Sequence, residues 1–207
     1  MKRIDFIASL LKGYEVAIDI GSDHGFVLKE ALDHGFIKRG IATDNKKGPL
    51  KAAQENLKGY DVEFILSDGF RSVESKADVA VIAGMGAHLI CDILSHSPLQ
   101  LEFILGPNDR LGVVRKYLVE HGFIITDEYV IRENFYYVFL KVKRGKMALN
   151  EQEIETGIHL QHKKEGQEYL SHQLKYYQNL LLKVTGKRQE EIKKVIGHYV
   201  NALTFYF

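Results

Sequence analysis

The most informative part of the chain is the run Val16-Ala-Ile-Asp-Ile-Gly-Ser-Asp-His-Gly25, in which an apolar stretch leads into a polar loop between two glycines. A helical pattern follows from Phe26 to Leu32, so we predict a strand, a tight loop and a helix. Glycine lets the backbone come close to a ligand, and the N-terminus of the helix offers free N–H groups. This corner therefore predicts a site for a nucleotide-like small molecule.

The loop itself narrows the choice of ligand. A dinucleotide site usually spaces its glycines as GxGxxG, whereas here Asp23 stands where the second glycine would be. A carboxylate there would repel a pyrophosphate but would suit a cationic ligand. S-adenosylmethionine carries an ammonium and a sulfonium group, so Asp19 and Asp23 could each face positive charge. The alternative is that Asp23 only caps the helix that begins near Phe26.

A second acidic residue follows the next predicted strand, Lys38-Arg-Gly-Ile-Ala-Thr-Asp44. Carboxylates at this place accept hydrogen bonds from the two hydroxyls of a ribose, and Asp44 is placed to do so. The alternative is that Asp44 belongs only to the polar turn that runs on to Pro49.

The rest of the first two thirds of the chain alternates between strand and helix patterns. An amphipathic helix precedes Gly13, further helices are predicted at 49–57, 87–94 and 109–121, and strands at 62–66, 77–82, 101–105, 123–131 and 135–143. The last two strands are joined by only three residues, so they must be antiparallel. An α/β fold with a parallel sheet and one antiparallel hairpin is typical of the seven-stranded, Rossmann-like methyltransferase fold. We assign residues 1–145 to this domain.

The remaining residues, 146–207, have a different pattern. From Asn150 onward, apolar residues recur at helical or heptad-like spacing with a break at Thr185-Gly-Lys187, which predicts two long helices in an antiparallel, coiled-coil-like hairpin. Such a hairpin must cover its apolar stripe with the main domain, a second copy or a large ligand. Its basic residues and histidines could contact phosphates, although such charges are more often a solvated surface. They are Lys163, Lys164, Lys187, Arg188, Lys193, Lys194, His159, His162 and His172.

Composition excludes several classes of protein. The chain has 207 residues, with 28 basic against 27 acidic ones, so no strongly basic nucleic-acid-binding domain is indicated. A single cysteine, Cys91, excludes a disulfide framework and fits a reducing compartment. The apolar stretch at the N-terminus is too short for a signal peptide or a membrane span, so we expect a cytoplasmic protein with no membrane contact.

The most specific signal is the predicted strand and turn Asp78-Val-Ala-Val-Ile-Ala-Gly-Met-Gly86. It lacks the Asn/Asp-Pro-Pro-aromatic loop of many adenine-modifying methyltransferases. Together with DIGSDHGF at 19–26, SDGF at 67–70 and FILGPN ending at Asn108, it resembles the bacterial tRNA adenine-22 N1-methyltransferase family over essentially the whole chain. The resemblance implies S-adenosyl-L-methionine as cofactor, tRNA as partner, methylation of N1 of an adenine, and a tRNA-contacting role for 146–207. A monomer without a metal ion is expected.

The resemblance also implies roles for single residues. The cofactor-binding residues lie at the ends of four strands and are Asp19, Gly21, Asp44, Asn45, Asp68, Gly69, Ala83 and Gly84. At the target base, the resemblance places Asp23 and His24 as catalytic residues and Phe26, Met85 and Asn108 as substrate contacts, with Phe70 as another candidate platform for the base. The alternatives are that Asp68 is only a turn residue and His24 only a polar residue at the start of a helix.

Three departures from the family pattern affect the substrate side. Where the family usually has Ala-Tyr-Leu-Pro, this chain has Gly25-Phe-Val-Leu28, so the tyrosine hydroxyl is lost; a common glycine is Ala87 and a common glutamine is Gly106. Two rival functions remain open at this point. One is a methyltransferase that acts on a small molecule or a protein, and the other is an RNA-binding module without catalysis.

Overall fold

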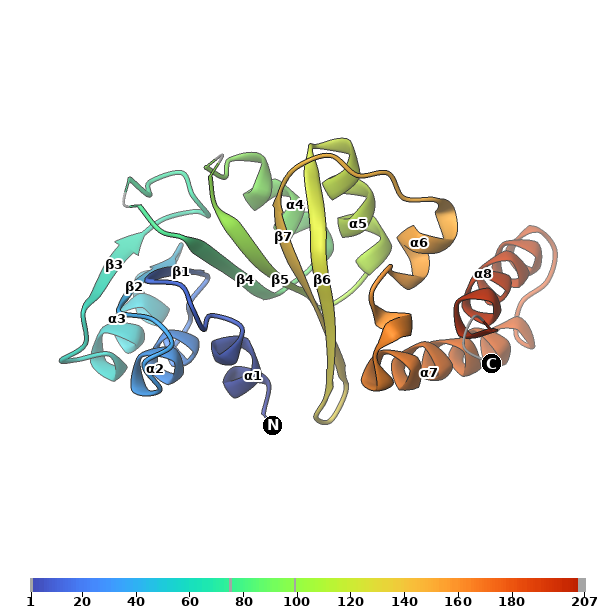
Figure 1. The fold of residues 1–207 in the computed structure, drawn as a ribbon, viewed down its shortest axis with the longest axis horizontal. Coiled ribbons are helices and arrows are strands. Elements are labelled where there is room, and N and C mark those ends of the chain that lie inside the picture. The colour runs from blue at the N-terminus through green and yellow to red at the C-terminus, as the bar shows by residue number, and fades with distance from the viewer. Residues whose placement is uncertain (1, 75, 99, 205–207) are drawn as a thin grey trace.

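A seven-stranded sheet forms the centre of the computed structural model, which describes residues 2–74, 76–98 and 100–204 (Figure 1). The strand order is β3-β2-β1-β4-β5-β7-β6, with β7 antiparallel to both of its neighbours and the other pairs parallel. The strands are β1 (Val16–Ile20), β2 (Arg39–Asp44), β3 (Val62–Leu66), β4 (Val79–Met85), β5 (Glu102–Pro107), β6 (Phe123–Arg132) and β7 (Tyr136–Arg144). The predicted Rossmann-like methyltransferase sheet is confirmed.

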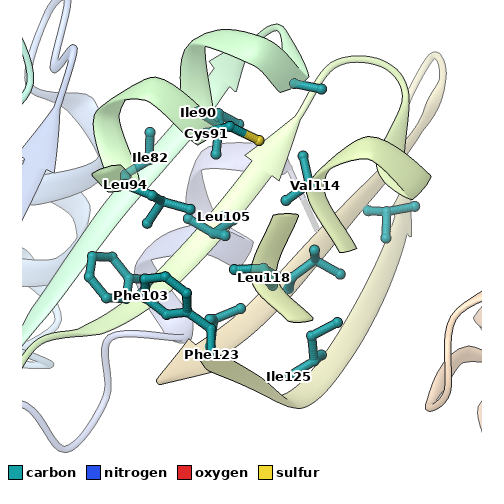
Figure 2. Packing of buried hydrophobic residues seen from close by; sticks show 14 of the residues in the cluster. Ile82, Ile90, Cys91, Leu94, Phe103, Leu105, Val114, Leu118, Phe123 and Ile125 are labelled. Carbon is teal, nitrogen blue, oxygen red and sulfur yellow. The ribbon is translucent and has the colours of Figure 1, made fainter. Parts of the chain in front are cut away.

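Helices cover both faces of this sheet because its strands are apolar on both sides. One face packs against α4 (Ala87–Ser95) and α5 (Leu111–Glu120), and the other against α1 (Arg3–Ser9), α2 (Phe26–Asp33) and α3 (Lys47–Asn56). Neighbouring residues of β5 point to opposite faces: Phe103 lies in the cluster under α4 and α5 (Figure 2), and Ile104 lies in the other. The burial of both faces fixes the register of the strands and thus the position of their ends.

The loops that follow the parallel strands lie next to one another along one edge of the sheet. The N–H groups of Gly21 and Ser22 both donate to the carbonyl of Thr43, and that of Ser67 donates to the carbonyl of Asp44. On the other side of β1, Ile20 pairs with Ile82 of β4, which places Ala83 beside residues 21–25, the glycine loop. Ligands of open α/β sheets bind at this edge, where the strand order reverses.

The C-terminal region departs in part from the expected pair of long helices. It contains α6 (Glu151–Thr156), a short 3₁₀ helix (Leu160–His162), α7 (Lys164–Leu181) and α8 (Lys187–Thr204), and α7 and α8 form the predicted hairpin. The expectation of one continuous helix from Asn150 was wrong, because the chain breaks at Gly157, where φ is +86°. The break turns the N–H groups of Ile158 and His159 toward the carboxylate of Glu128, at 2.7 and 2.9 Å.

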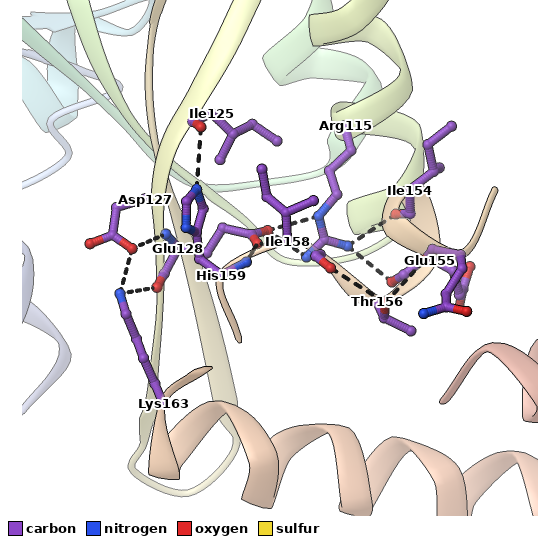
Figure 3. Close-up of polar contacts among 12 residues, drawn as sticks. Arg115, Ile125, Asp127, Glu128, Ile154, Glu155, Thr156, Ile158, His159 and Lys163 are labelled. Carbon is purple, nitrogen blue, oxygen red and sulfur yellow. Dashed lines mark hydrogen bonds and ion pairs between the residues drawn. The ribbon is translucent and has the colours of Figure 1, made fainter. Parts of the chain in front are cut away.

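A buried ion pair anchors this region to the sheet domain (Figure 3). Arg115 of α5 and Glu128 of β6 are both fully buried, and the Arg115 guanidinium also donates to the carbonyls of Ile154 and Glu155 at 3.1 and 3.0 Å. Lys163 adds an ion pair with Asp127 at 2.5 Å. Leu170 and Tyr199 of the hairpin belong to the main hydrophobic cluster, so part of the hairpin docks on the sheet domain.

None of the helices in the described ranges is long and apolar enough to cross a membrane.

Candidate functional site

A cavity of about 270 Å³ lies where β1 and β4 end, between the glycine loop and α1. It brings together seven of the predicted site residues from two distant stretches of sequence. Five come from the first stretch and two from the second: Asp19, Gly21, Asp23, His24 and Phe26, then Ala83 and Gly84. The two stretches meet because β1 and β4 are neighbours in the sheet although β2 and β3 separate them in sequence. The sequence order alone does not reveal this adjacency.

The backbone conformation of the glycine loop requires glycine at both of its ends, Gly21 and Gly25. Gly21 has φ of +74°, and a Cβ there would lie 2.2 Å from the terminal methyl group of Met85. Gly25 has φ of +72° and is the N-cap of α2, with no side chain capping that helix. The alternative that Asp23 caps the helix is therefore wrong, and its carboxylate is left for another partner. Asp23 itself has a positive φ of 32°, a strained conformation for a residue other than glycine.

Asp19 lies deepest in the site. It is buried, and its carboxylate accepts a hydrogen bond from the Ser22 hydroxyl at 2.7 Å. Burial raises the pKa of the Asp19 carboxyl to about 6, with the bond from Ser22 opposing the shift and the negative charge of Asp44 adding to it. A carboxylate that is costly to ionise in this place would be stabilised by a cationic ligand beside it.

The residues predicted to bind the ribose lie at the end of β2, just outside the cavity. One oxygen of Asp44 accepts from the backbone N–H of Lys46 at 2.8 Å, which is the turn contact foreseen as the alternative. The other oxygen has no hydrogen bond within the described residues, so it can still accept a hydrogen bond from a ligand. Asn45 is exposed beside it. The role of both residues toward a ribose stays a prediction.

The residues predicted to bind the cofactor adenine follow β3. Asp68 forms an exposed ion pair with Arg71 at 2.8 Å, and Gly69 has φ of +61° against the side chain of Ile93. The expectation that Phe70 is a platform for a base was wrong, because its ring is buried in the core and contacts Phe103 edge to face. Asp68 can accept from an adenine amino group only by sharing its oxygens with Arg71.

The predicted catalytic residues stand together at the mouth of the cavity. The side chains of Asp23 and His24 are 71% and 49% exposed, with 3.7 Å between Asp23 Oδ1 and His24 Nε2. The ring of His24 stacks on that of Phe26, with 5.4 Å between the centroids, and Phe26 is half exposed. A carboxylate and an accessible aromatic surface therefore face the same opening, an arrangement suited to a planar base that gains positive charge.

A hydrogen bond connects the loops after β4 and β5. The Asn108 amide donates to the carbonyl of Gly84 at 2.7 Å, and the Asn108 N–H donates to the carbonyl of Met85 at 2.9 Å. Gly84 has φ of +77° and open space where a Cβ would be, so its backbone is accessible to a ligand. Asn108 thus positions the wall of the cavity rather than reaching into it.

Two of the departures from the family pattern have a structural reason. A Cβ at Gly106 would lie 2.8 Å from the Phe139 ring and 2.9 Å from the Ala83 methyl group, so this chain has no room for a glutamine there. Ala87 is buried at the start of α4, and its N–H donates to the carboxylate of Asp109 at 2.9 Å.

The basic residues of the hairpin are only partly available for phosphate contacts. Lys163 is held by Asp127, Arg188 pairs with Glu191, Lys193 with Glu190, and Lys194 with Glu151. The solvated-surface interpretation therefore accounts for part of this set, and Lys163 in particular belongs to the anchor of the region. Lys164 has no ion pair within the described residues.

Sequence reasoning missed the contribution of the N-terminal helix to the site. Arg3, Ile4 and Ile7 of α1 line the cavity beside the glycine loop, and Ser22 binds Asp19 from within it. Ser22 could have been found, since it stands inside the quoted loop. The amphipathic pattern of α1 gave no sign of which surface the helix covers.

Comparison with known proteins supports the resemblance. The model of the tRNA (adenine(22)-N(1))-methyltransferase family matches residues 17–204. A Mycoplasma pneumoniae protein assigned as a tRNA methyltransferase is 31% identical over 98% of this chain and 99% of its own length. The tRNA (adenine(22)-N(1))-methyltransferase of Bacillus subtilis is 28% identical over 64% of this chain and 60% of its length. A Streptococcus pneumoniae protein assigned to the same tRNA modification, in complex with S-adenosyl-L-methionine, has a TM-score of 0.87 at 26% identity, with 98% of this chain and 99% of that chain covered.

Proposed function

This chain belongs to the tRNA (adenine(22)-N(1))-methyltransferase family, and from this premise we propose which of its residues carry out the reaction. The enzyme transfers a methyl group from S-adenosyl-L-methionine to N1 of adenine 22 of a tRNA. The observation that carries the residue assignment is the exposed group Asp23, His24 and Phe26 at the mouth of the cavity between β1 and β4.

The cofactor crevice runs along the ends of four neighbouring strands. Asp19 and Gly21 bind the methionine portion, Asp44 and Asn45 the ribose, and Asp68 and Gly69 the adenine, while Ala83 and Gly84 form the wall. Support comes from the hydrogen bonds that join these loops edge to edge and from the open space at Gly84. When bound, S-adenosyl-L-methionine supplies a methyl group on a positively charged sulfur.

The chain needs no residue that removes a proton from the substrate. N1 of neutral adenine has a lone pair in the plane of the ring, so the main task is to align the base and exclude water. Methylation leaves positive charge on the adenine ring, and the Asp23 carboxylate stabilises that charge as it develops. The left-handed backbone and the exposed side chain of Asp23 support this role.

The target base must leave the tRNA helix before it can react, because N1 lies on its Watson-Crick edge. Phe26, stacked on His24, offers the flipped base a flat surface at the opening of the cavity. Met85 lies against Gly21 on the inner side, and Asn108 fixes the loop that carries it. We assign substrate contacts to Phe26 and Met85 and a positioning role to Asn108.

The C-terminal region 146–207 binds the tRNA outside the pocket, and residues 1–145 carry the chemistry. The enzyme acts in the cytoplasm as a monomer. Support for the division comes from the change of pattern after β7 and from the buried anchor that holds the hairpin beside the sheet edge.

The direct test is incubation with labelled S-adenosyl-L-methionine and an unmodified tRNA transcript, followed by mapping of reverse-transcriptase stops. A stop at adenine 22 is expected, since N1-methyladenine cannot pair. Replacement of that adenine by guanine in the transcript is the matched control and should abolish both label and stop. Label without a stop at that position would contradict the assignment.

A further inference from the structure

A second, larger cleft lies between the sheet domain and the helical hairpin. Its volume is about 620 Å³, within the roughly 300–1,000 Å³ range of sites for small ligands. Its walls come from the end of β5, the start of α5, the start of β7, and the facing sides of α6, α7 and α8. Of the residues given roles above, only Asn108 lines this cleft.

Four tyrosines dominate its lining: Tyr136 from β7, Tyr169 and Tyr177 from α7, and Tyr199 from α8. Tyr136 and Tyr169 meet edge to face at 5.7 Å between centroids, and Tyr177 stacks on Tyr199 at 5.5 Å. Rings in this number around one cleft suit a flat aromatic guest, because bases of any sequence stack on them.

Polar groups in the same cleft suit the edge of a base. The hydroxyls of Tyr177 and Tyr199 donate to Glu155 at 3.3 and 3.1 Å, which orients the carboxylate as an acceptor, and Gln173 offers an amide. A carboxylate in this position would repel a phosphate but can accept from an exocyclic amino group. The interior therefore favours a base over an anion.

Basic residues lie at the margins, where the phosphates of such a nucleotide would be. Arg110, the N-cap residue of α5, and Lys116, in the middle of α5, line the cleft and are exposed. On its other side, Tyr136 also lines a neighbouring groove that carries Arg132, Lys164 and Lys175 against a single acidic residue, Glu168. Within the described ranges none of these three cations is in an ion pair, so the groove carries a net positive charge.

The cleft adjoins the reaction site through one residue. Asn108, which binds the carbonyl of Gly84 in the cofactor wall, is itself part of the cleft lining. One strand of RNA could therefore reach both places. An unpaired nucleotide is the guest that fits the aromatic interior, the acceptor at Glu155 and the cationic margin together.

We propose that this cleft binds one unpaired nucleotide of the tRNA, separate from the target adenine, and that the Arg132–Lys164–Lys175 groove holds the phosphates beside it. The inference rests on the proposed function, because it takes tRNA as the partner. It adds a recognition site outside the reaction pocket, on the hairpin side of the molecule.

The test combines kinetics with a matched set of variants. Tyr136→Leu removes the ring, Tyr136→Phe keeps it, and Tyr176→Leu removes a half-exposed tyrosine of α7 that does not line the cleft. Tyr136→Leu is expected to raise KM for tRNA about tenfold, with kcat and the affinity for S-adenosyl-L-methionine nearly unchanged, because a base loses its stacking partner. Tyr136→Phe and Tyr176→Leu should match the wild type. Equal KM values for all four proteins would overturn the proposal.

The groove is tested by the salt dependence of tRNA binding. Lys175→Gln should lower the slope of log affinity against log salt by about one, whereas Lys58→Gln, an exposed lysine just after α3, should leave it unchanged. An unchanged slope for Lys175→Gln would show that the groove does not bind the phosphates of the tRNA.

A cross-linking experiment tests the cleft in the wild-type enzyme, so its result does not depend on whether a variant folds. A tRNA transcript carrying 4-thiouridine is irradiated with the enzyme, and cross-linked peptides are mapped. Cross-links to the β7 or α7 tyrosines support the cleft, even if no methyl group is transferred, in which case only the catalytic assignment fails. Methylation with cross-links confined to other segments would overturn the cleft and leave the catalytic assignment intact.

Discussion

The guanidinium of Arg115 contacts the carboxylate of Glu128 at 2.8 Å in a place where neither side chain is exposed to solvent. Arg115 Nε donates to Glu128 Oε1 at 2.9 Å, whereas Nη2 meets the same oxygen without the geometry of a hydrogen bond. The second oxygen of Glu128 is occupied by the N–H groups of Ile158 and His159. The pair therefore joins α5, β6 and the start of the C-terminal region at one point.

Arg115→Met should lower the free energy of unfolding by about 3–5 kcal/mol, because it leaves the buried negative charge of Glu128 without its cationic partner. Urea unfolding measures the change. The double variant Arg115→Met with Glu128→Gln should recover part of the loss. Arg188→Met, which breaks an exposed pair with Glu191, serves as the control and should change stability by no more than about 0.5 kcal/mol.

Asp19→Asn should stabilise the protein at neutral pH and weaken the binding of S-adenosyl-L-methionine. The pKa of Asp19 is raised to about 6 in the folded state from 3.8, so the unfolded state loses its proton first as pH rises. As pH rises from about 4 to about 6, the contribution of the Asp19 carboxyl to the free energy of unfolding of the wild type therefore falls, by roughly 3 kcal/mol at most.

Urea unfolding at pH 4 and pH 7.5 separates a stabilisation that comes from the raised pKa of Asp19 from one that does not depend on pH. The stabilising effect of Asp19→Asn should be present at pH 7.5 and largely absent at pH 4, where the wild-type carboxyl is protonated in the folded state. If the free energies of unfolding of the variant and the wild type differed by the same amount at both pH values, the raised pKa of Asp19 would be contradicted.

Asp23→Ala should reduce the rate of methyl transfer about a hundredfold with near-normal cofactor affinity, as expected for the loss of one electrostatic contact in the transition state. Single-turnover rates and calorimetry measure the two quantities. Asp61→Ala removes a comparably exposed carboxylate just before β3 and should retain full activity. Unchanged turnover in Asp23→Ala would remove this residue from the reaction.

Truncation after Lys163 should keep a folded domain with cofactor affinity within about threefold of the wild type, while tRNA affinity falls more than tenfold. The shortened chain retains the carbonyl and N–H groups that satisfy Arg115 and Glu128. Truncation after Asn150 removes them and should be several kcal/mol less stable than truncation after Lys163. Circular dichroism during urea unfolding compares the two, and equal stability would refute the anchoring role.

Gly106→Gln, which restores the residue common in the family, should destabilise this chain by about 1–3 kcal/mol, because its Cβ would clash with Phe139 and Ala83. Gly48→Ala in α3 is the control, since open space surrounds that position and alanine favours a helix. Thermal unfolding of both variants checks the prediction. If Gly106→Gln left the thermal stability unchanged, the packing between β4 and β5 would have to rearrange to accept the side chain, contrary to the prediction.

Much of the domain was predictable because its signals are local. Apolar runs of strand length, helical periodicity and the glycine loop gave the order of the elements of the sheet domain and the loops that carry Asp23, Asp44 and Ala83. The break at Gly157 was not predictable in the same way. Helical spacing continues through Ile154 and Ile158, and the reason to interrupt it lies in Glu128, about thirty residues away.

The sequence by itself determined the fold class and the family, since both depend on patterns of residues that are neighbours in the chain. Only the tertiary structure decided that Phe70 lies in the core, that α1 covers the glycine loop, and that tyrosines from β7, α7 and α8 surround one cleft. The physical reason is that burial and ion pairing depend on which surfaces meet, and surfaces distant in sequence meet only when the whole chain packs.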